Sequence, residues 1–181
     1  MEIKLETERL LLQTINMSHV ESYFDFLIRN AEFFKKWSPA YDEGYSGLEY
    51  HKKRMAAAEK DMAEGRLMKF AVLLKNNLNN IIGTVSFSNI IKGPFQSCFL
   101  GYRMDEKENG KGYAKEAIRK GVDYMLNEVK LHRIEANIIR HNKPSIRVAE
   151  KLGFAYEGMS KKYLQINGNW EDHLHYVLLN E

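Results

Sequence analysis

The chain has 181 residues, of which 44% are hydrophobic and 28% charged, with 12 glycines and 3 prolines. This composition is typical of one soluble globular domain and excludes collagen-like, low-complexity and disordered chains. The 27 basic and 24 acidic residues leave a net charge of +3 and form no basic block, so we expect no direct nucleic-acid partner. The single cysteine, Cys98, excludes an internal disulfide framework and a cysteine-rich zinc site. It also favours a reducing compartment, by default the cytoplasm.

The apolar runs do not indicate export or a membrane span. Residues 1–6 alternate charged and apolar side chains where a signal peptide would need an apolar core. No stretch approaches the roughly 18 consecutive apolar residues of a membrane helix. We therefore expect a protein that is neither secreted nor associated with a membrane.

The first elements are a strand and a helix. The apolar run over residues 10–15 favours a strand, and Ser18-x-x-Glu21 then has the spacing of a capping box. Apolar side chains recur after it at helical spacing and predict a helix that reaches toward Phe34 and ends near Trp37.

A second capping pattern, Ser46-x-x-Glu49, opens the next predicted helix. This helix covers residues 48–64 and stops at Gly65, where the chain can adopt a left-handed conformation.

Three strands are predicted in the middle of the chain. Apolar runs over residues 67–74 and 81–87 flank the asparagine-rich residues 76–80, which suit a hairpin loop because asparagine tolerates positive φ. After Gly93-Pro94 breaks the chain, residues 98–104 again favour a strand.

A long helix follows Gly110-Lys111-Gly112. Its apolar side chains fall at i, i+3, i+4, i+7, i+8 and i+11, which is the stripe of a helix buried on one face. Small residues in the stripe favour close packing on a sheet. The stripe consists of Ala114, Ala117, Ile118, Gly121, Val122 and Met125.

The last elements are a strand, a helix and a hairpin. Alternating apolar residues over 134–138 predict a strand, and Pro144 suits the first turn of a helix that ends at Gly153. Asn167-Gly168 is a strong turn signal between strands near residues 159–166 and 170–179.

The order is strand, two helices, three strands, helix, strand, helix, two strands. The strand-helix-strand unit of residues 98–140 predicts a parallel pair with a right-handed crossover, and the hairpins predict antiparallel pairs. The fold class is therefore α/β (α+β), with a mixed, mostly antiparallel sheet flanked by about four helices. No repeat or linker interrupts the chain, so we expect one domain over residues 1–181.

The segment Asn109-Gly110-Lys111-Gly112-Tyr113-Ala114-Lys115 lies between a strand and a helix. Its glycines leave backbone amides accessible, and the helix start adds unpaired amides and a positive dipole, a combination suited to a pyrophosphate. Two nucleotide motifs do not match it. A P-loop would need glycine at Asp105, and a dinucleotide fingerprint would need Gly or Ala at Lys115. By itself this segment is equally compatible with a tight strand-to-helix turn.

A second segment, Asn142 to Phe154, follows the next strand. Together with Gly101-Tyr102, Gly112-Tyr113-Ala114 and Leu131 to Ala136, it resembles the GNAT N-acetyltransferase superfamily. More narrowly it resembles the Rim-type (RimJ/RimL-like) branch, which acetylates the N-termini of ribosomal proteins. The resemblance implies a central parallel strand pair that splays apart, with a single GNAT-like domain.

The resemblance also implies acetyl-CoA as the cofactor and no metal. Backbone amides of the glycine segment would hold the pyrophosphate, the splayed strand near Tyr102 would pair with the pantetheine arm, and Asn142 would contact that arm. The family has Arg or Gln where Asn109 stands, so this chain lacks one long side chain that would brace the loop. The implied cofactor residues are Tyr102, Arg103, Met104, Gly110, Lys111, Gly112, Tyr113, Ala114, Lys115 and Asn142.

Two residues are candidates for the chemistry. By resemblance, Ser145 would stand near the departing sulfur, where it could donate a hydrogen bond to the thiolate; serine is equally common in a first helical turn. Glu135 lies mid-strand beside the cofactor strand and is our candidate base, reaching the amine through water. A salt-bridged strand carboxylate is an equally good interpretation of Glu135.

Three aromatic residues, Trp37, Tyr163 and Trp170, lie in segments that line the acceptor cleft in the family. Core packing is the competing interpretation and is stronger for Trp170, which is on a strand. His173-x-His175 lacks a third ligand pattern, so a structural role is favoured over a metal site. Cys98 is interpreted as a small buried hydrophobe.

The resemblance leads to three hypotheses. The first is an acetyl-CoA-dependent N-acetyltransferase that acts on a protein N-terminus, most plausibly of a ribosomal protein. The second keeps the donor but acts on a small amine, such as an amino acid, a polyamine or an antibiotic. The third is a CoA-binding sensor or interaction module without turnover. The family analogy allows a homodimer.

Overall fold

The structure is a computed structural model that describes residues 2–181. Its helices are α1 (Val20–Arg29), α2 (Ala31–Lys35), α3 (Leu48–Ala63), α4 (Tyr113–Asn127) and α5 (Lys143–Lys151), with short 3-10 helices at Met17–His19 and Glu106–Glu108. Its strands are β1 (Lys4–Glu6), β2 (Leu10–Thr14), β3 (Met68–Leu74), β4 (Asn77–Ile91), β5 (Ser97–Met104), β6 (Arg133–Ile139), β7 (Ala155–Ile166) and β8 (Asn169–Leu179).

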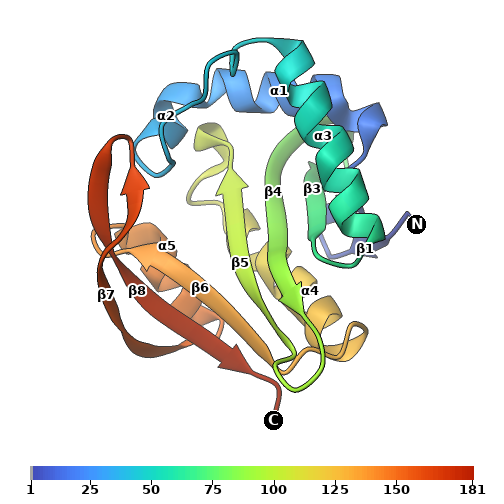
Figure 1. Cartoon of the computed structure of the whole chain (residues 1–181). Coiled ribbons are helices and arrows are strands. Elements are labelled where there is room, and N and C mark those ends of the chain that lie inside the picture. Colours follow the sequence, from blue (N-terminus) through green and yellow to red (C-terminus); the bar gives the residue numbers. More distant parts are fainter. Residues whose placement is uncertain (1) are drawn as a thin grey trace.

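All eight strands form one sheet in the order β1-β2-β3-β4-β5-β6-β8-β7 (Figure 1). Neighbours are antiparallel except β5 and β6, which are parallel and joined through α4, as the sequence predicts. The predicted fold class is confirmed: a mostly antiparallel sheet with one central parallel pair, flanked by helices.

The parallel pair separates along its length. Pairing between β5 and β6 covers only residues 97–99 and 133–135, at the lower end of both strands in Figure 1. Above this point β5 stays paired with β4 and β6 with β8, so the two halves of the sheet diverge. From residue 100 to 104, the β6-facing edge of β5 has no partner strand. The splay expected from the family resemblance is therefore present.

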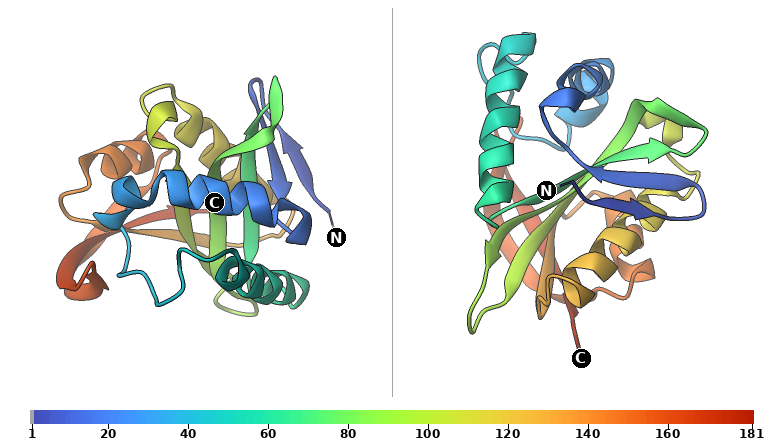
Figure 2. Two further views of the ribbon diagram at one scale, coloured as in Figure 1. Left: turned by 90° about the horizontal axis from the view of Figure 1, so that it is seen from above. Right: turned by 90° about the vertical axis from the view of Figure 1, so that its right-hand side faces the viewer.

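The helices cover opposite faces of the sheet, with α1 and α3 on one side and α4 and α5 on the other (Figure 2). Alternate residues of β3 divide between two cores: Phe70 and Val72 join the core under α4, and Ala71 and Leu73 join the core under α1 and α3. A Cβ added at Gly121 would lie 3.0 Å from the Phe87 ring, so the small residue lets α4 lie directly on the sheet.

The helix starts differ from the predicted ones. Asn16, and not Ser18, caps the first helical segment: its side chain accepts from the Ser18 amide, while His19 Nδ1 accepts from the Asn16 amide. The second predicted cap is also wrong, because α3 begins after Gly47 and no side chain caps it. In both places the N-cap residue lies within two residues of a serine that has the spacing of a capping box but does not stand at the helix start.

One predicted helix is divided in two. The Asn30 side chain donates to the Phe26 carbonyl at 2.9 Å and ends α1, so that α2 starts as a separate short helix. This is the competition between a local side-chain hydrogen bond and the helical ladder that asparagine offers. The division gives five α-helices where about four are expected.

Two expected features of the sheet are also corrected. The asparagine-rich residues 76–80 are not a loop, because β4 begins at Asn77 and the turn contains only residues 75 and 76. No residue of this segment has positive φ. The sequence analysis also missed β1, whose 3 residues pair with β2 at the sheet edge.

An ion pair joins the end of α1 to the segment before the glycine loop. Asp105 accepts from Arg29 Nε at 2.8 Å and from the Lys107 amide at 3.1 Å, and Arg29 also donates to the Ile81 carbonyl. The Asp105 side chain is 9% exposed. Burial alone would raise the pKa of Asp105, but these hydrogen bonds outweigh it and hold the pKa below its ordinary value.

We expect Asp105→Asn to lower the free energy of unfolding by about 1.5–3 kcal/mol at neutral pH, the range for a hydrogen bond to a charged group. Because the folded pKa is lowered, the wild-type advantage is complete above the unfolded pKa of about 4 and is lost as the pH falls further. Urea unfolding at several pH values measures this difference. Exposed Asp123→Asn is the control, and a difference that persists unchanged in acid contradicts the account.

Candidate functional site

A cavity of about 980 Å³ lies over the splay of the sheet. The glycine segment lines one end, with Gly110, Gly112 and Lys115, and the other end is lined by Tyr23 and Lys69. The residues between these ends come from β5 and from the start of α5. We call this the main cavity. It brings together, from the predicted residues, Trp37, Tyr102, Arg103, Met104, Gly110, Gly112, Tyr113, Ala114, Lys115, Asn142 and Ser145.

The glycine loop has the conformation that an anion cradle requires. Gly110 and Gly112 have φ of 80° and 84°, values that favour glycine, and α4 begins at the next residue. No side chain caps α4, so the amides of its first turn have no side-chain partner. A Cβ at Gly110 would meet no atom within 4 Å, which leaves open space above the loop. The exposed amides and the helix dipole together fit a pyrophosphate.

Arg9 braces this loop from the β1–β2 turn. Its Nη1 donates to the Lys111 carbonyl at 3.0 Å, and its guanidinium lies 4.5 Å from the centre of the Tyr113 ring. Glu116 on α4 accepts from Arg9 Nε at 2.7 Å and from the Thr7 hydroxyl at 2.6 Å. Arg9 thus supplies a long brace to a loop that has only Asn109 where the family has a longer side chain.

The acid–base environment of this brace is consistent with a permanent ion pair. Burial alone would raise the pKa of Glu116, but the hydrogen bonds from Thr7 and Arg9 outweigh it and lower the pKa. The same carboxylate raises the pKa of Arg9. Both groups therefore remain charged across the physiological range.

Ser145 lies on the α5 wall of the main cavity. Its hydroxyl accepts from the Tyr102 hydroxyl at 2.8 Å, and its amide donates to the Asn142 side chain, which caps α5. Burial raises the pKa of Tyr102, so this phenol stays protonated and keeps donating. The Ser145 hydrogen is then free to donate into the cavity, as hydrogen bonding to a developing thiolate would require.

Glu135 is outside the residues that line the main cavity. It pairs with Arg133 at 3.2 Å and its other oxygen lies 3.0 Å from His175 Nδ1, while His175 Nε2 lies 2.8 Å from the Ser160 hydroxyl. This network covers the face of β6 and β8. The role of Glu135 as a base stays a prediction. Its contacts are those of a salt-bridged strand carboxylate, which is the alternative interpretation.

Of the three predicted cleft aromatics, only Trp37 lines the main cavity. Tyr163 stacks edge-on against His175, and Trp170 is 60% exposed on the β7–β8 hairpin, so core packing of Trp170 is wrong. The tip of this hairpin contacts the cavity wall, because the Asn167 amide donates to the Ser38 carbonyl at 3.1 Å.

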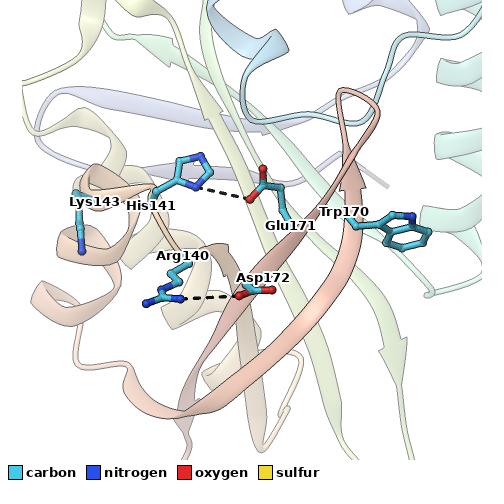
Figure 3. Close-up of a pocket in the computed structure, with 6 residues that line it drawn as sticks. All are labelled: Arg140, His141, Lys143, Trp170, Glu171 and Asp172. Atoms are coloured by element: carbon cyan, nitrogen blue, oxygen red, sulfur yellow. Dashed lines mark ion pairs between the residues drawn. The ribbon is translucent and has the colours of Figure 1, made fainter.

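A shallow hollow of about 380 Å³ at this hairpin is a weaker candidate site (Figure 3). His141 faces Glu171 and Arg140 faces Asp172, at 3.7 and 3.9 Å, and the two basic side chains of the lining, Arg140 and Lys143, are balanced by these two carboxylates. The Trp170 indole points away from this group (Figure 3).

A second cavity of about 500 Å³, which we call the side cavity, adjoins the main cavity under α3. Six polar side chains line both cavities and form what we call the junction: Tyr23, Ser38, Arg54, Lys69, Ser86 and Arg103. Sequence analysis missed all of these except Arg103. Tyr23 sits on an ordinary amphipathic helix and Lys69 on an ordinary strand, so neither stands out until the fold places them together.

The remaining candidates have structural roles. Cys98 is 2% exposed, and burial raises the pKa of its thiol to about 12, so the interpretation as a buried hydrophobe holds. His173 is buried with Nδ1 against the Glu171 carbonyl. Within residues 2–181 no group of three or more His, Cys, Asp or Glu side chains is arranged to hold a metal ion. None of the helices in that range is long and apolar enough to span a membrane.

Comparison with known proteins identifies the family. A model described as Acetyltransferase (GNAT) domain matches residues 9–155. The chain is 35% identical to the probable N-acetyltransferase YjcK of Bacillus subtilis over 97% of both chains. It is 34% identical to the [ribosomal protein uS5]-alanine N-acetyltransferase of Escherichia coli, over 96% of this chain and 89% of the relative.

A solved structure agrees with these matches. The ribosomal-protein-S5-alanine acetyltransferase of Vibrio fischeri superposes with a TM-score of 0.93 at 34% identity, covering 99% of this chain and 97% of that one. The chain therefore belongs to the GNAT acetyltransferase family and is an N-acetyltransferase. The resemblance stated from the sequence is confirmed.

We expect Arg9→Met to weaken CoA binding about five- to tenfold, because the Lys111 carbonyl and the first turn of α4 lose their brace. Titration calorimetry with CoA measures the dissociation constant directly. Arg119→Met, on the exposed face of the same helix, should leave it unchanged. Equal affinities of Arg9→Met and the wild type would show that the loop holds its conformation without Arg9.

Proposed function

We propose that this protein transfers the acetyl group of acetyl-CoA to the N-terminal α-amine of a ribosomal protein. The acceptor we propose is the N-terminal alanine of uS5. The observation that carries the proposal is the geometry of the two cavities: an open glycine loop at one end, and a side cavity that continues the main cavity at the other. The relatives in Escherichia coli and Vibrio fischeri are named for this acceptor. Such a protein would act in the cytoplasm.

The donor end uses backbone groups. Amides of Gly110, Gly112 and the first turn of α4 would hold the pyrophosphate, and the unpaired edge of β5 would pair with the pantetheine arm. Bound there, acetyl-CoA supplies an activated thioester. Backbone amides on the unpaired edge of β5 would donate to its carbonyl oxygen as negative charge develops. Ser145 would donate to the departing sulfur, held in place by Tyr102 and Asn142.

The acceptor end favours a neutral amine. Three cations, Arg54, Lys69 and Arg103, line the junction, and positive surroundings oppose binding of a protonated amine. An α-amine of pKa about 8 needs only about 1.4 kcal/mol to lose its proton at pH 7, whereas a lysine side chain needs more than about 4. The site therefore suits a protein N-terminus better than a lysine side chain.

An acceptor panel tests the proposal. CoA-thiol release should be fastest with a peptide carrying the uS5 N-terminus, and acetylating that peptide's α-amine beforehand should abolish release. Small amines such as polyamines and free amino acids are the competing acceptors. Turnover of a small amine with none of the peptide would move the assignment to the second hypothesis, and CoA binding without any turnover would move it to the sensor.

We expect Ser145→Ala to lower kcat about tenfold with little change in CoA affinity, because the hydroxyl assists the leaving group and the Asn142 cap is kept. Steady-state kinetics with saturating CoA thioester measure kcat, and calorimetry measures the affinity. If kcat is unaltered, Ser145 is a helix residue only.

A further inference from the structure

The junction is the place where an acceptor amine must meet the donor. A donor anchored at the glycine loop would occupy the end of the main cavity that Gly110 and Gly112 line, and its arm would follow the unpaired edge of β5. The amine must then arrive from the opposite end, through the side cavity. The residues common to both cavities, Tyr23 and Lys69 among them, therefore face the amine.

Few groups near the junction can take a proton. Among its six polar side chains there is no carboxylate and no histidine. Arginine and lysine side chains in their charged forms only donate hydrogen bonds, and the serines have no adjacent base. The carboxylates of the side cavity are engaged elsewhere: Asp42 accepts from the Tyr50 hydroxyl at 2.6 Å, and Asp61 pairs with Arg66. Only the phenol of Tyr23 is left at the junction itself.

The histidine of the side cavity lies outside the junction. His51 lines only the side cavity and is buried among aromatic rings, with Nε2 2.6 Å from the Tyr45 carbonyl. A carbonyl oxygen only accepts, so Nε2 carries the hydrogen of the neutral ring. Burial lowers the pKa of His51 and favours this neutral form, whose Nδ1 can accept a proton, but the ring lines the side cavity alone and is not at the junction. Glu108 lies at the glycine-loop end and pairs with Lys111.

The Tyr23 ring packs against apolar core residues and stacks on Phe26, whereas the charged groups that act on its hydroxyl are all cations. Lys69 on β3 donates to its hydroxyl at 2.8 Å, Arg103 approaches from β5 and Arg54 from α3. The Tyr45 phenol is the nearby titratable group of the loop before α3, and burial raises its pKa, so it remains neutral. Burial alone would raise the pKa of Tyr23 as well, but the three cations outweigh it and lower the pKa.

Tyr23 differs in this from the other tyrosines whose pKa is shifted. Among the tyrosines of residues 2–181 whose pKa is shifted, Tyr23 is the one whose pKa is lowered. Five other phenols have a raised pKa, namely those of Tyr45, Tyr50, Tyr102, Tyr124 and Tyr176. A phenol that ionises early, next to a place where an amine must lose a proton, has the properties of a general base.

We propose that Tyr23 is the residue that deprotonates the acceptor amine, with Lys69 positioning its oxygen. The Tyr23 phenolate takes one proton from the ammonium group, which gives a neutral phenol and an amine whose lone pair can attack the thioester carbonyl. Solvent in the side cavity then takes the proton from the phenol. Lys69 donates to the oxygen throughout and stabilises its negative charge. This inference rests on the proposed function, because it needs an amine acceptor.

Kinetics test the proposal with the uS5 N-terminal peptide as acceptor. Tyr23→Phe keeps the ring and should lower kcat/KM by about tenfold or more, with CoA affinity unchanged as evidence of folding. Lys69→Met should raise the pKa of Tyr23, so the pH at which kcat/KM levels off should move upward. In Tyr23→Phe only the titration of the peptide amine should remain. Tyr124→Phe, which removes a phenol outside both cavities, should match the wild type.

A second readout needs no acceptor. In the ultraviolet absorbance titration of tyrosinate, the wild type should show one phenol that ionises at lower pH than the rest. That step should vanish in Tyr23→Phe, move to higher pH in Lys69→Met, and remain in Tyr124→Phe. This measurement separates the two claims, because absence of turnover with every amine overturns the proposed function without affecting the titration.

Either of two results overturns the role of Tyr23. The first is a Tyr23→Phe variant that binds CoA normally and keeps the wild-type kcat/KM and pH profile. The second is a wild-type titration in which no early phenol step depends on Tyr23. A loss of kcat/KM in Tyr23→Phe together with an upward shift in Lys69→Met supports it.

Discussion

The separation of β5 from β6 is the constraint on which the rest of the site depends. Three residue pairs hold the strands together at one end, and beyond them each strand pairs only with its outer neighbour. The opening leaves β5 with backbone groups that a bound molecule can satisfy, which an intact sheet could not offer. It also places the starts of α4 and α5 on the same cavity, because each helix follows a strand that ends there. The glycine loop and the Ser145 hydroxyl therefore line the same cavity.

A net charge of +3 is sufficient for a protein that binds an anion with a few local groups. Backbone amides and a helix start would attract the phosphates, and the guanidinium that braces the loop, Arg9, is neutralised by Glu116. Arg9 contacts the Lys111 carbonyl and the Tyr113 ring, so it fixes the conformation of the loop more than it adds positive charge. Three further cations, Arg54, Lys69 and Arg103, line the junction, where they discourage a protonated amine. Donor and acceptor are thus selected by different electrostatics within one cavity.

The sequence predicted those parts of the fold and site that are local. The glycine loop, the buried stripe of α4 and the Asn167-Gly168 turn follow from chemistry within a few residues, and each is present. Capping serines failed because spacing alone does not fix the backbone at which a helix begins. Contacts between distant segments could not be predicted. Arg9 meets the loop from 102 residues away and Lys69 meets Tyr23 from 46, and each has an unremarkable local pattern.

The junction connects the choice of acceptor to the choice of base. Cations that oppose a charged amine also stabilise a phenolate. The same three side chains therefore lower the free energy of deprotonation of both the acceptor amine and Tyr23. A carboxylate base at this position would attract the ammonium form and hold it in an ion pair, which is the unreactive state. A phenolate has the same charge but is a stronger base than a carboxylate, so it takes the proton from the ammonium, and cations around it are needed to populate it near neutral pH. A tyrosine base with cationic neighbours is therefore suited to amines that are already close to neutrality, as a protein N-terminus is.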